Sequence, residues 1–168
     1  MTIRRLVLFA VVLAVAASTR AQNLKSWDNQ IDGSSRWKIL SDFDDAAVLD
    51  KETGLVWEKD PISQQPVFAN ANFLCYARSI GGRRGWRLPM IFELMTLVDP
   101  SQTNPGLPPG HPFPNLTGTE FWSATTVEDN TANAWAVNFS FGTVTQAAKT
   151  TVKRMLCVRG PGGSPHQY

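Results

Sequence analysis

The sequence predicts one α+β domain that follows a short N-terminal export segment. Helical patterns are confined to residues 66–98, and strand patterns lie on both sides of them. This order differs from the strand–helix alternation of a parallel sheet and favours two helices packed on antiparallel sheets. The length of 168 residues fits one domain. A hydrophobic content of 43% against 18% charged residues indicates a packed core rather than a disordered chain.

Residues 1–21 have the three-part pattern of a secretory signal peptide. Arg4 and Arg5 precede an uncharged apolar run over 6–17, and small residues follow it. At 1.5 Å per residue this run is too short to cross a hydrocarbon core of ~30 Å, which argues against a membrane anchor. We predict cleavage after Ala21, with a cut after Ser18 as the alternative. The protein is therefore expected to be secreted or periplasmic, with membrane contact only through the uncleaved signal.

The formal charge of +2 comes from this segment rather than from the mature domain. Cleavage after Ala21 leaves 13 basic and 14 acidic residues, a charge of −1. A nucleic-acid partner is therefore not expected from the charge of the whole chain. Any preference for anions has to come from a local patch.

Cys75 and Cys157 are the only cysteines, and both lie in the mature part. In an oxidising compartment an isolated pair is most simply one disulfide. Two buried thiols or a catalytic thiol are the alternatives. Neither cysteine has a neighbouring histidine to activate it.

The N-terminal half of the mature chain predicts a lead-in, a strand and a hairpin. Residues 22–36 are polar and form the lead-in, and residues 37–40 fit a first strand. Apolar runs over 47–49 and 55–57 flank a polar loop that ends in Gly54. Glycine suits the left-handed conformation that a short hairpin connection requires.

Two helices are predicted next. The first covers 66–80, with Pro66 in its first turn and Gly81-Gly82 as its stop signal. Phe68, Ala71, Leu74, Cys75 and Arg78 follow helical spacing. The second covers 91–98 and ends at Asp99-Pro100. Its apolar face is expected to consist of Ile91, Leu94, Met95 and Val98.

A long loop and several strands complete the prediction. Residues 99–118 hold six of the 11 prolines without periodicity, which indicates a functional or packed surface loop. Strands are expected from Phe121, around Trp135, and over 154–159, with a turn at 140–143. Residues 161–168 are interpreted as a flexible tail.

Three segments carry a resemblance to a known family. Val48 to Trp57 is similar to a D-x-x-T-G-L-x-W opening, and residues 82–94 contain a G-W-R-L-P-x-x-x-E-L motif. Residues 121–125 and 157–160 resemble W-S-S-T and C-V-R-G closing motifs. Together they resemble the Lcl C-terminal domain family of exported bacterial proteins over residues 37–160. The motif residues are Asp50, Thr53, Gly54, Trp57, Trp86, Arg87, Leu88, Pro89, Glu93 and Trp122.

This resemblance implies a C-type-lectin-like fold with a disulfide between the first helix and the last strand. Cys75 and Cys157 occupy the matching positions. The family's named member is a collagen-like adhesin whose C-terminal domain binds sulfated glycosaminoglycans, but this chain has no Gly-x-y repeat. It also departs from the family at Met90, where a hydroxyl residue is usual, so the second helix is expected to lack that N-cap.

Aromatic and basic residues are the binding candidates. Tryptophans at 57, 86, 122 and 135 could stack on sugars but are expected in the core, whereas Trp27 is expected to be exposed. Arg83 and Arg84 suit sulfate or carboxylate recognition, and Lys149, Lys153 and Arg154 form a second basic group. The alternative is that these clusters are solvated surface, with Arg87 in a structural ion pair with Glu93.

Metal binding and catalysis are not predicted. Residues 128–130 (Glu-Asp-Asn) are interpreted as a polar turn rather than a Ca²⁺ site, and His111 and His166 lie far apart without acidic or cysteine neighbours. No phosphate loop or nucleophile motif is evident. We expect a non-catalytic, cofactor-free, lectin-like module that binds a glycan, through the 99–118 loop and the surface around Arg83 and Arg84. A structural or protein-interaction module of the cell envelope, or a host-protein ligand, is the alternative, and a diverged enzyme is less favoured.

Overall fold

The computed structural model describes residues 33–118 and 120–160. In chain order its elements are α1 (Gly33–Arg36), β1 (Trp37–Ile39), a 3₁₀ turn η1 (Ser41–Phe43), β2 (Ala47–Asp50), β3 (Val56–Glu58), α2 (Phe68–Ala77), α3 (Ile91–Met95), β4 (Glu120–Thr126), β5 (Asn133–Asn138), β6 (Thr143–Ala148) and β7 (Val158–Arg159). The expected α+β class is confirmed. The predicted signal peptide, Trp27, His166 and the predicted tail lie outside the described residues.

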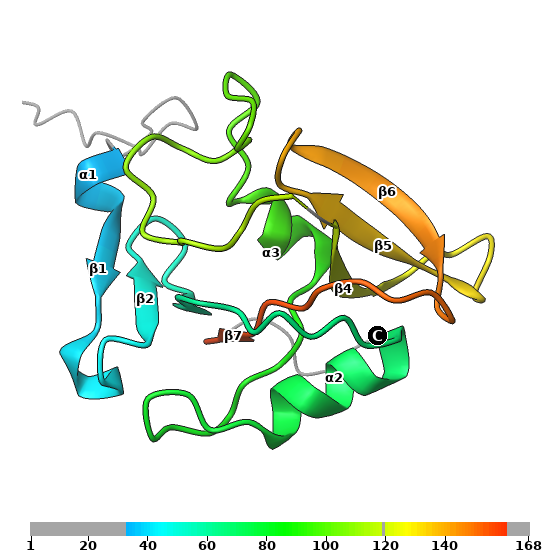
Figure 1. Cartoon of the computed structure of the whole chain (residues 1–168), viewed down its shortest axis with the longest axis horizontal. Coiled ribbons are helices and arrows are strands. Elements are labelled where there is room, and N and C mark those ends of the chain that lie inside the picture. Colours follow the sequence, from blue (N-terminus) through cyan, green and yellow to red (C-terminus); the bar gives the residue numbers. More distant parts are fainter. Residues whose placement is uncertain (1–32, 119, 161–168) are drawn as a thin grey trace, which may run out of the picture. The chain divides into compact units, whose positions relative to one another are not determined.

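Two antiparallel sheets form the framework, as Figure 1 shows. One has the strand order β1-β2-β3-β7 and contains the predicted hairpin, in which Val48 pairs with Trp57. The other is the β4-β5-β6 meander, with α2 and α3 packed against its strands. None of the helices among the described residues is long and apolar enough to span a membrane.

The segment 155–158 separates two hydrophobic clusters and contributes side chains to both. Leu156 and Val158 pack into the first cluster, and Met155 and Cys157 pack into the second. The alternating pattern predicted one buried face, but all four side chains are fully buried. A segment with apolar neighbours on both sides has no solvent face, so a strand pattern alone could not predict this position. Only Val158 and Arg159 form a strand, shorter than expected.

Both main helices are shorter than predicted. α2 ends at Ala77, because Arg78 is extended (φ −73°, ψ 148°), so Gly81-Gly82 is not its stop signal. α3 ends at Met95, which is 38% exposed, whereas Leu94 and Leu97 are fully buried. Met95, which we placed on the apolar face, is therefore partly exposed to solvent. The side of this short helix that packs into the core is the one that carries Leu94.

The N-terminus of α3 lacks a side-chain cap from Met90, as expected. Two other groups satisfy its backbone donors. The Ile91 N–H donates to Thr125 Oγ1 on β4 at 3.0 Å, and the Met90 N–H donates to Glu93 Oε2 at 2.8 Å. Free N–H groups at a helix start need such acceptors, and here the sheet supplies one.

The 99–118 loop contains no helix or strand, as predicted, but much of it is core. Leu107, Phe113 and Leu116 are at most 2% exposed and belong to the first cluster. The tryptophan predictions hold for Trp57, Trp86 and Trp122, which are fully buried. They fail for Trp135, which is only half-buried, although Val137 on the same face of β5 is fully buried.

Candidate functional site

The two cysteines form the expected disulfide. Cys75 in α2 is bonded to Cys157 just before β7, with Cα atoms 5.5 Å apart and 82 residues of separation. Both side chains are fully buried. The alternatives of two buried thiols or a catalytic thiol are therefore wrong.

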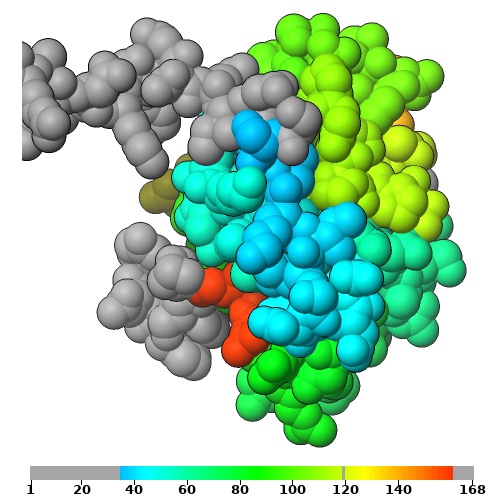
Figure 2. All heavy atoms as spheres, turned by 90° about the vertical axis from the view of Figure 1, so that its left-hand side faces the viewer, coloured from blue at the N-terminus to red at the C-terminus, as the bar shows by residue number. Residues whose placement is uncertain are grey.

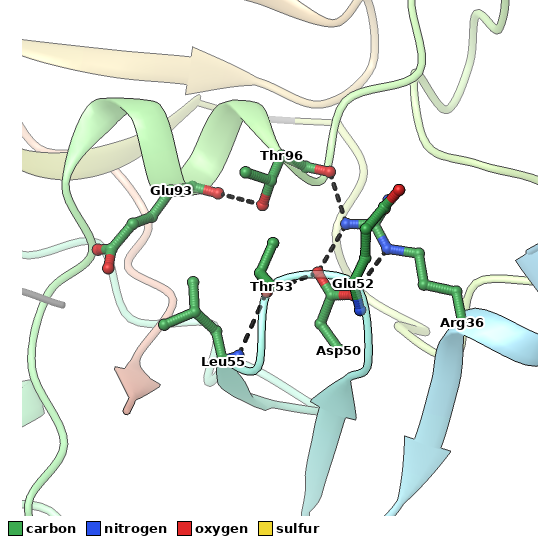
Figure 3. Close-up of polar contacts among 7 residues, drawn as sticks. All are labelled: Arg36, Asp50, Glu52, Thr53, Leu55, Glu93 and Thr96. Carbon is green, nitrogen blue, oxygen red and sulfur yellow. Dashed lines mark hydrogen bonds and ion pairs between the residues drawn. The ribbon is translucent and has the colours of Figure 1, made fainter. Parts of the chain in front are cut away.

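The hairpin motif between β2 and β3 is a structural turn, shown in Figure 3. Asp50 is fully buried, and its carboxylate accepts hydrogen bonds from Thr53 Oγ1 (2.9 Å) and from the Glu52 N–H (3.0 Å). Thr53 Oγ1 in turn accepts from the Leu55 N–H at 3.2 Å. Gly54 has φ +75°, which glycine adopts without strain. The Asp50 carboxylate and the Thr53 hydroxyl are therefore used to hold the loop.

Arg36 completes this turn, although no pattern in the sequence pointed to it. Its guanidinium donates to both carboxylate oxygens of Asp50 (2.9 and 2.7 Å) and to the Thr96 carbonyl (2.7 Å), as Figure 3 shows. It also pairs with Glu52 at 3.0 Å. The last residue of the predicted lead-in thus connects the hairpin to the end of α3.

The central motif is also architectural. Arg87 makes two hydrogen bonds to Glu93, of 2.7 and 2.6 Å, so the proposed ion pair is present. Leu88 is buried, and the Pro89 carbonyl accepts from the Ala124 N–H of β4 at 2.7 Å. This bidentate pair and the strand contact place Arg87 in the framework rather than at a binding surface.

Gly81 and Gly82 form a tight two-residue turn between Ile80 and Arg83. The backbone groups of Ile80 and Arg83 exchange two hydrogen bonds, and both glycines have positive φ (+56° and +68°). Such a turn requires the left-handed conformation at both central positions. The glycines that we interpreted as a helix stop therefore make the hairpin that presents Arg83 and Arg84.

Arg83 and Arg159 converge on one aromatic ring. Their guanidinium carbons lie 5.8 and 5.6 Å from the centre of the Phe43 ring, within the range of a cation–π contact. Phe43 in turn meets the buried Trp86 edge to face, at 6.1 Å. Two cations from distant parts of the chain thus share one aromatic support.

We call Arg83, Arg84, Arg159 and Phe43 the arginine surface. Arg83 and Arg84 are exposed and Arg159 is half-buried. Among the described residues, no carboxylate lies within 4.0 Å of these three guanidinium groups. Figure 2 shows the red end of β7 on the surface beside the blue-to-cyan segment, with a green segment below. These are donor groups whose charges are not neutralised by a direct partner.

The second predicted basic group is differently arranged. Lys149 Nζ donates to Thr126 Oγ1 at 2.9 Å and lies over the Phe68 ring. Lys153 forms an ion pair with Glu120. Arg154 donates to two backbone carbonyls, and burial lowers the pKa of its guanidinium. The structure therefore brings together Arg83 and Arg84 but not Lys149 and Lys153 with them.

The acidic and histidine candidates form no cluster. Among the described residues there is no group of three or more histidine, cysteine or acidic side chains that could hold a metal ion. Glu128, Asp129 and Asn130 are exposed in the turn between β4 and β5. Burial lowers the pKa of His111, whose Nδ1 accepts from the Phe113 N–H at 3.3 Å.

A comparison with protein families identifies the chain by these same segments. The model of the Lcl C-terminal domain matches residues 46–159. The chain belongs to the Lcl C-terminal domain family. The match spans the hairpin turn, both helices, the disulfide and β7, which are the features that build the Lcl C-terminal domain here. A comparison with curated proteins gave no match.

Proposed function

We propose that this protein is an exported, non-catalytic binding module that recognises an anionic extracellular polysaccharide through the arginine surface. The observation that carries the proposal is the convergence of Arg83 and Arg159 on Phe43 without a carboxylate partner among the described residues. Guanidinium groups pair sulfate or carboxylate oxygens two at a time. An aromatic ring that restrains them lowers the entropy lost on binding.

Two observations support the export and the non-catalytic role. The disulfide suits an oxidising compartment, and it leaves neither cysteine as a thiolate nucleophile. The motif residues with the strongest polar contacts, Asp50 and Glu93, are occupied in turns and ion pairs.

The test is the binding of heparin and of neutral dextran, measured by titration calorimetry. We expect heparin binding that weakens at least tenfold between about 50 and 500 mM salt, since exposed charges are screened. The Arg83→Ala/Arg84→Ala variant should lose at least tenfold in affinity. The matched Lys51→Ala/Lys149→Ala variant removes two charges elsewhere and should stay close to the wild type.

Three results would count against this proposal. They are heparin binding that is indifferent to salt, equal losses in the two double variants, and tighter binding to a short DNA duplex than to heparin.

A protein-interaction module of the envelope is the second candidate, favoured by α2. Phe73 and Tyr76 are 66% and 76% exposed, one helical turn apart on its outer face. Exposed aromatic residues are typical of protein interfaces. Capture of a partner that a Phe73→Ser/Tyr76→Ser variant loses, but the arginine variant retains, would support this candidate.

A further inference from the structure

A pocket of about 320 Å³ lies at the edge of the β4-β5-β6 sheet. It is lined by Gln65, Gly118, Glu120, Asn138, Val152 and Lys153. None of these residues belongs to the arginine surface. Its volume is at the lower end of the range of small-molecule sites, about 300–1,000 Å³.

The charges in this pocket cancel each other. Glu120 Oε2 forms an ion pair with Lys153, and Glu120 Oε1 accepts a hydrogen bond from Thr145 Oγ1 at 2.6 Å. Lys153 also lies over the Trp122 ring, 5.4 Å from its centre. Burial raises the pKa of Glu120, but the hydrogen bonds from Lys153 and Thr145 outweigh it and lower the pKa overall. The carboxylate is therefore ionised, fixed in place and 30% exposed at the pocket.

Two amide side chains line the same pocket with free groups. Asn138 Oδ1 accepts from the Ser140 N–H at 2.9 Å, while its Nδ2 has no hydrogen-bond partner among the described residues. Gln65 is exposed, and its amide makes no side-chain hydrogen bond within the described parts of the chain. Val152, 57% exposed, adds an apolar edge.

We propose that this pocket binds a neutral polyhydroxylated ligand, a sugar residue of a glycan, at a site separate from the arginine surface. Hydroxyl groups both donate and accept, so they match a fixed carboxylate, an ammonium group and two amides at once. The apolar edge of Val152 fits the C–H face of a sugar ring. An anion would meet Glu120 and a cation would meet Lys153, so a charged ligand gains little here.

The experiment uses two-dimensional ¹⁵N NMR of the wild-type protein with neutral sugars. The probes are the methyl glycosides of glucose, galactose and mannose, together with N-acetylglucosamine and lactose. We expect at least one of them to shift the amide signals of Gly118, Glu120, Asn138 and Lys153. We also expect the affinity to change less than twofold between about 50 and 500 mM salt, because no net charge is involved.

Gln65→Ala and Asn138→Asp should weaken this binding at least fivefold. Asn138→Asp keeps an oxygen that accepts from the Ser140 N–H, but it replaces the free amide donor with an acceptor and adds a negative charge. Gln64→Ala is the matched control, because Gln64 is an exposed neighbour that does not line the pocket. The spectrum of each variant shows directly whether it is folded.

The site is refuted if none of the sugars shifts these signals at about 100 mM. It is also refuted if Gln64→Ala weakens binding as much as Gln65→Ala, or if the shifted signals lie at Arg83 and Arg159. Because heparin binding depends on other residues and on salt, this result and the test of the arginine surface can succeed or fail separately.

Discussion

Glu58, the last residue of β3, is a buried carboxylic acid that contacts the backbone of the disulfide residue Cys157. Its side chain is 1% exposed, Oε2 accepts from the Cys157 N–H at 3.2 Å, and Oε1 lies 2.6 Å from Arg78 Nη1. Burial raises its pKa to about 7, against the lowering effect of Arg78 and of the Cys157 N–H. The folded protein therefore holds a proton on Glu58 at a pH where the unfolded chain has released it.

This proton makes the stability depend on pH. The stabilising contribution is complete below the unfolded pKa of 4.5 and is lost as the pH rises through about 7. Relative to Glu58→Gln, the wild-type free energy of unfolding should fall by about 3 kcal/mol between these limits. Urea denaturation at a series of pH values measures it, with Glu128→Gln as an exposed control. Parallel pH profiles for the wild type and Glu58→Gln would contradict the assignment.

At the scale of elements, the two-glycine turn determines where the arginine surface lies. A Cβ atom at Gly81 would stand 2.1 Å from the Phe43 carbonyl oxygen, whereas at Gly82 it would meet nothing within 4 Å. Both positions have positive φ, so alanine is strained at each. Only at Gly81 does the strain come with a backbone collision against the segment that carries Phe43.

We therefore expect Gly82→Ala to lower the free energy of unfolding by about 1 kcal/mol. Gly81→Ala should cost several times as much and should also weaken heparin binding, since the turn must move away from Phe43. Urea denaturation and calorimetry of the two variants test this pair. Equal stability losses would show that the contact with Phe43 does not determine the position of the turn.

At the scale of the whole molecule, the disulfide joins α2 to the segment 155–158, which separates the two hydrophobic clusters. Its 82-residue separation spans α2, α3, the long loop and the second sheet. Closing a loop of this length is worth roughly 4–5 kcal/mol in the chain-entropy description. The Cys75→Ala/Cys157→Ala variant should lose about this amount in urea denaturation, and a reductant should destabilise the wild type but not the variant. A loss below about 1 kcal/mol would contradict it.

Much of the fold could be predicted from particular residues. Gly54 with its flanking apolar runs predicted the hairpin, and Cys75 with Cys157 predicted the bridge. The limits of the helices could not be predicted, because Arg78 leaves the helix towards Glu58 and this partner is 20 residues away in sequence. The prediction that Trp135 is buried failed for a similar reason: how far the packing covers its face of β5 depends on other elements, and it covers Val137 but not all of Trp135.

The candidate site was predictable only in part. Arg83 and Arg84 stand beside a glycine pair, and this local signal was enough to select them. Arg159 was part of a closing motif but was not assigned to binding, and Phe43 carried no signal at all. Their meeting depends on the pairing of β7 with β3, which no local pattern encodes.

The sequence by itself determined the α+β class, the hairpin turn, the disulfide partners and the family, because each depends on local spacing or on residue types that have few alternatives. Only the tertiary structure decided which basic residues are free and which are neutralised. Lys153 and Arg83 look alike in sequence, but Lys153 faces Glu120, whereas Arg83 faces a ring shared with Arg159. A basic side chain can bind a ligand when no carboxylate lies close enough to neutralise it. Whether one does depends on distances between residues that are far apart along the chain, and only the fold sets these distances.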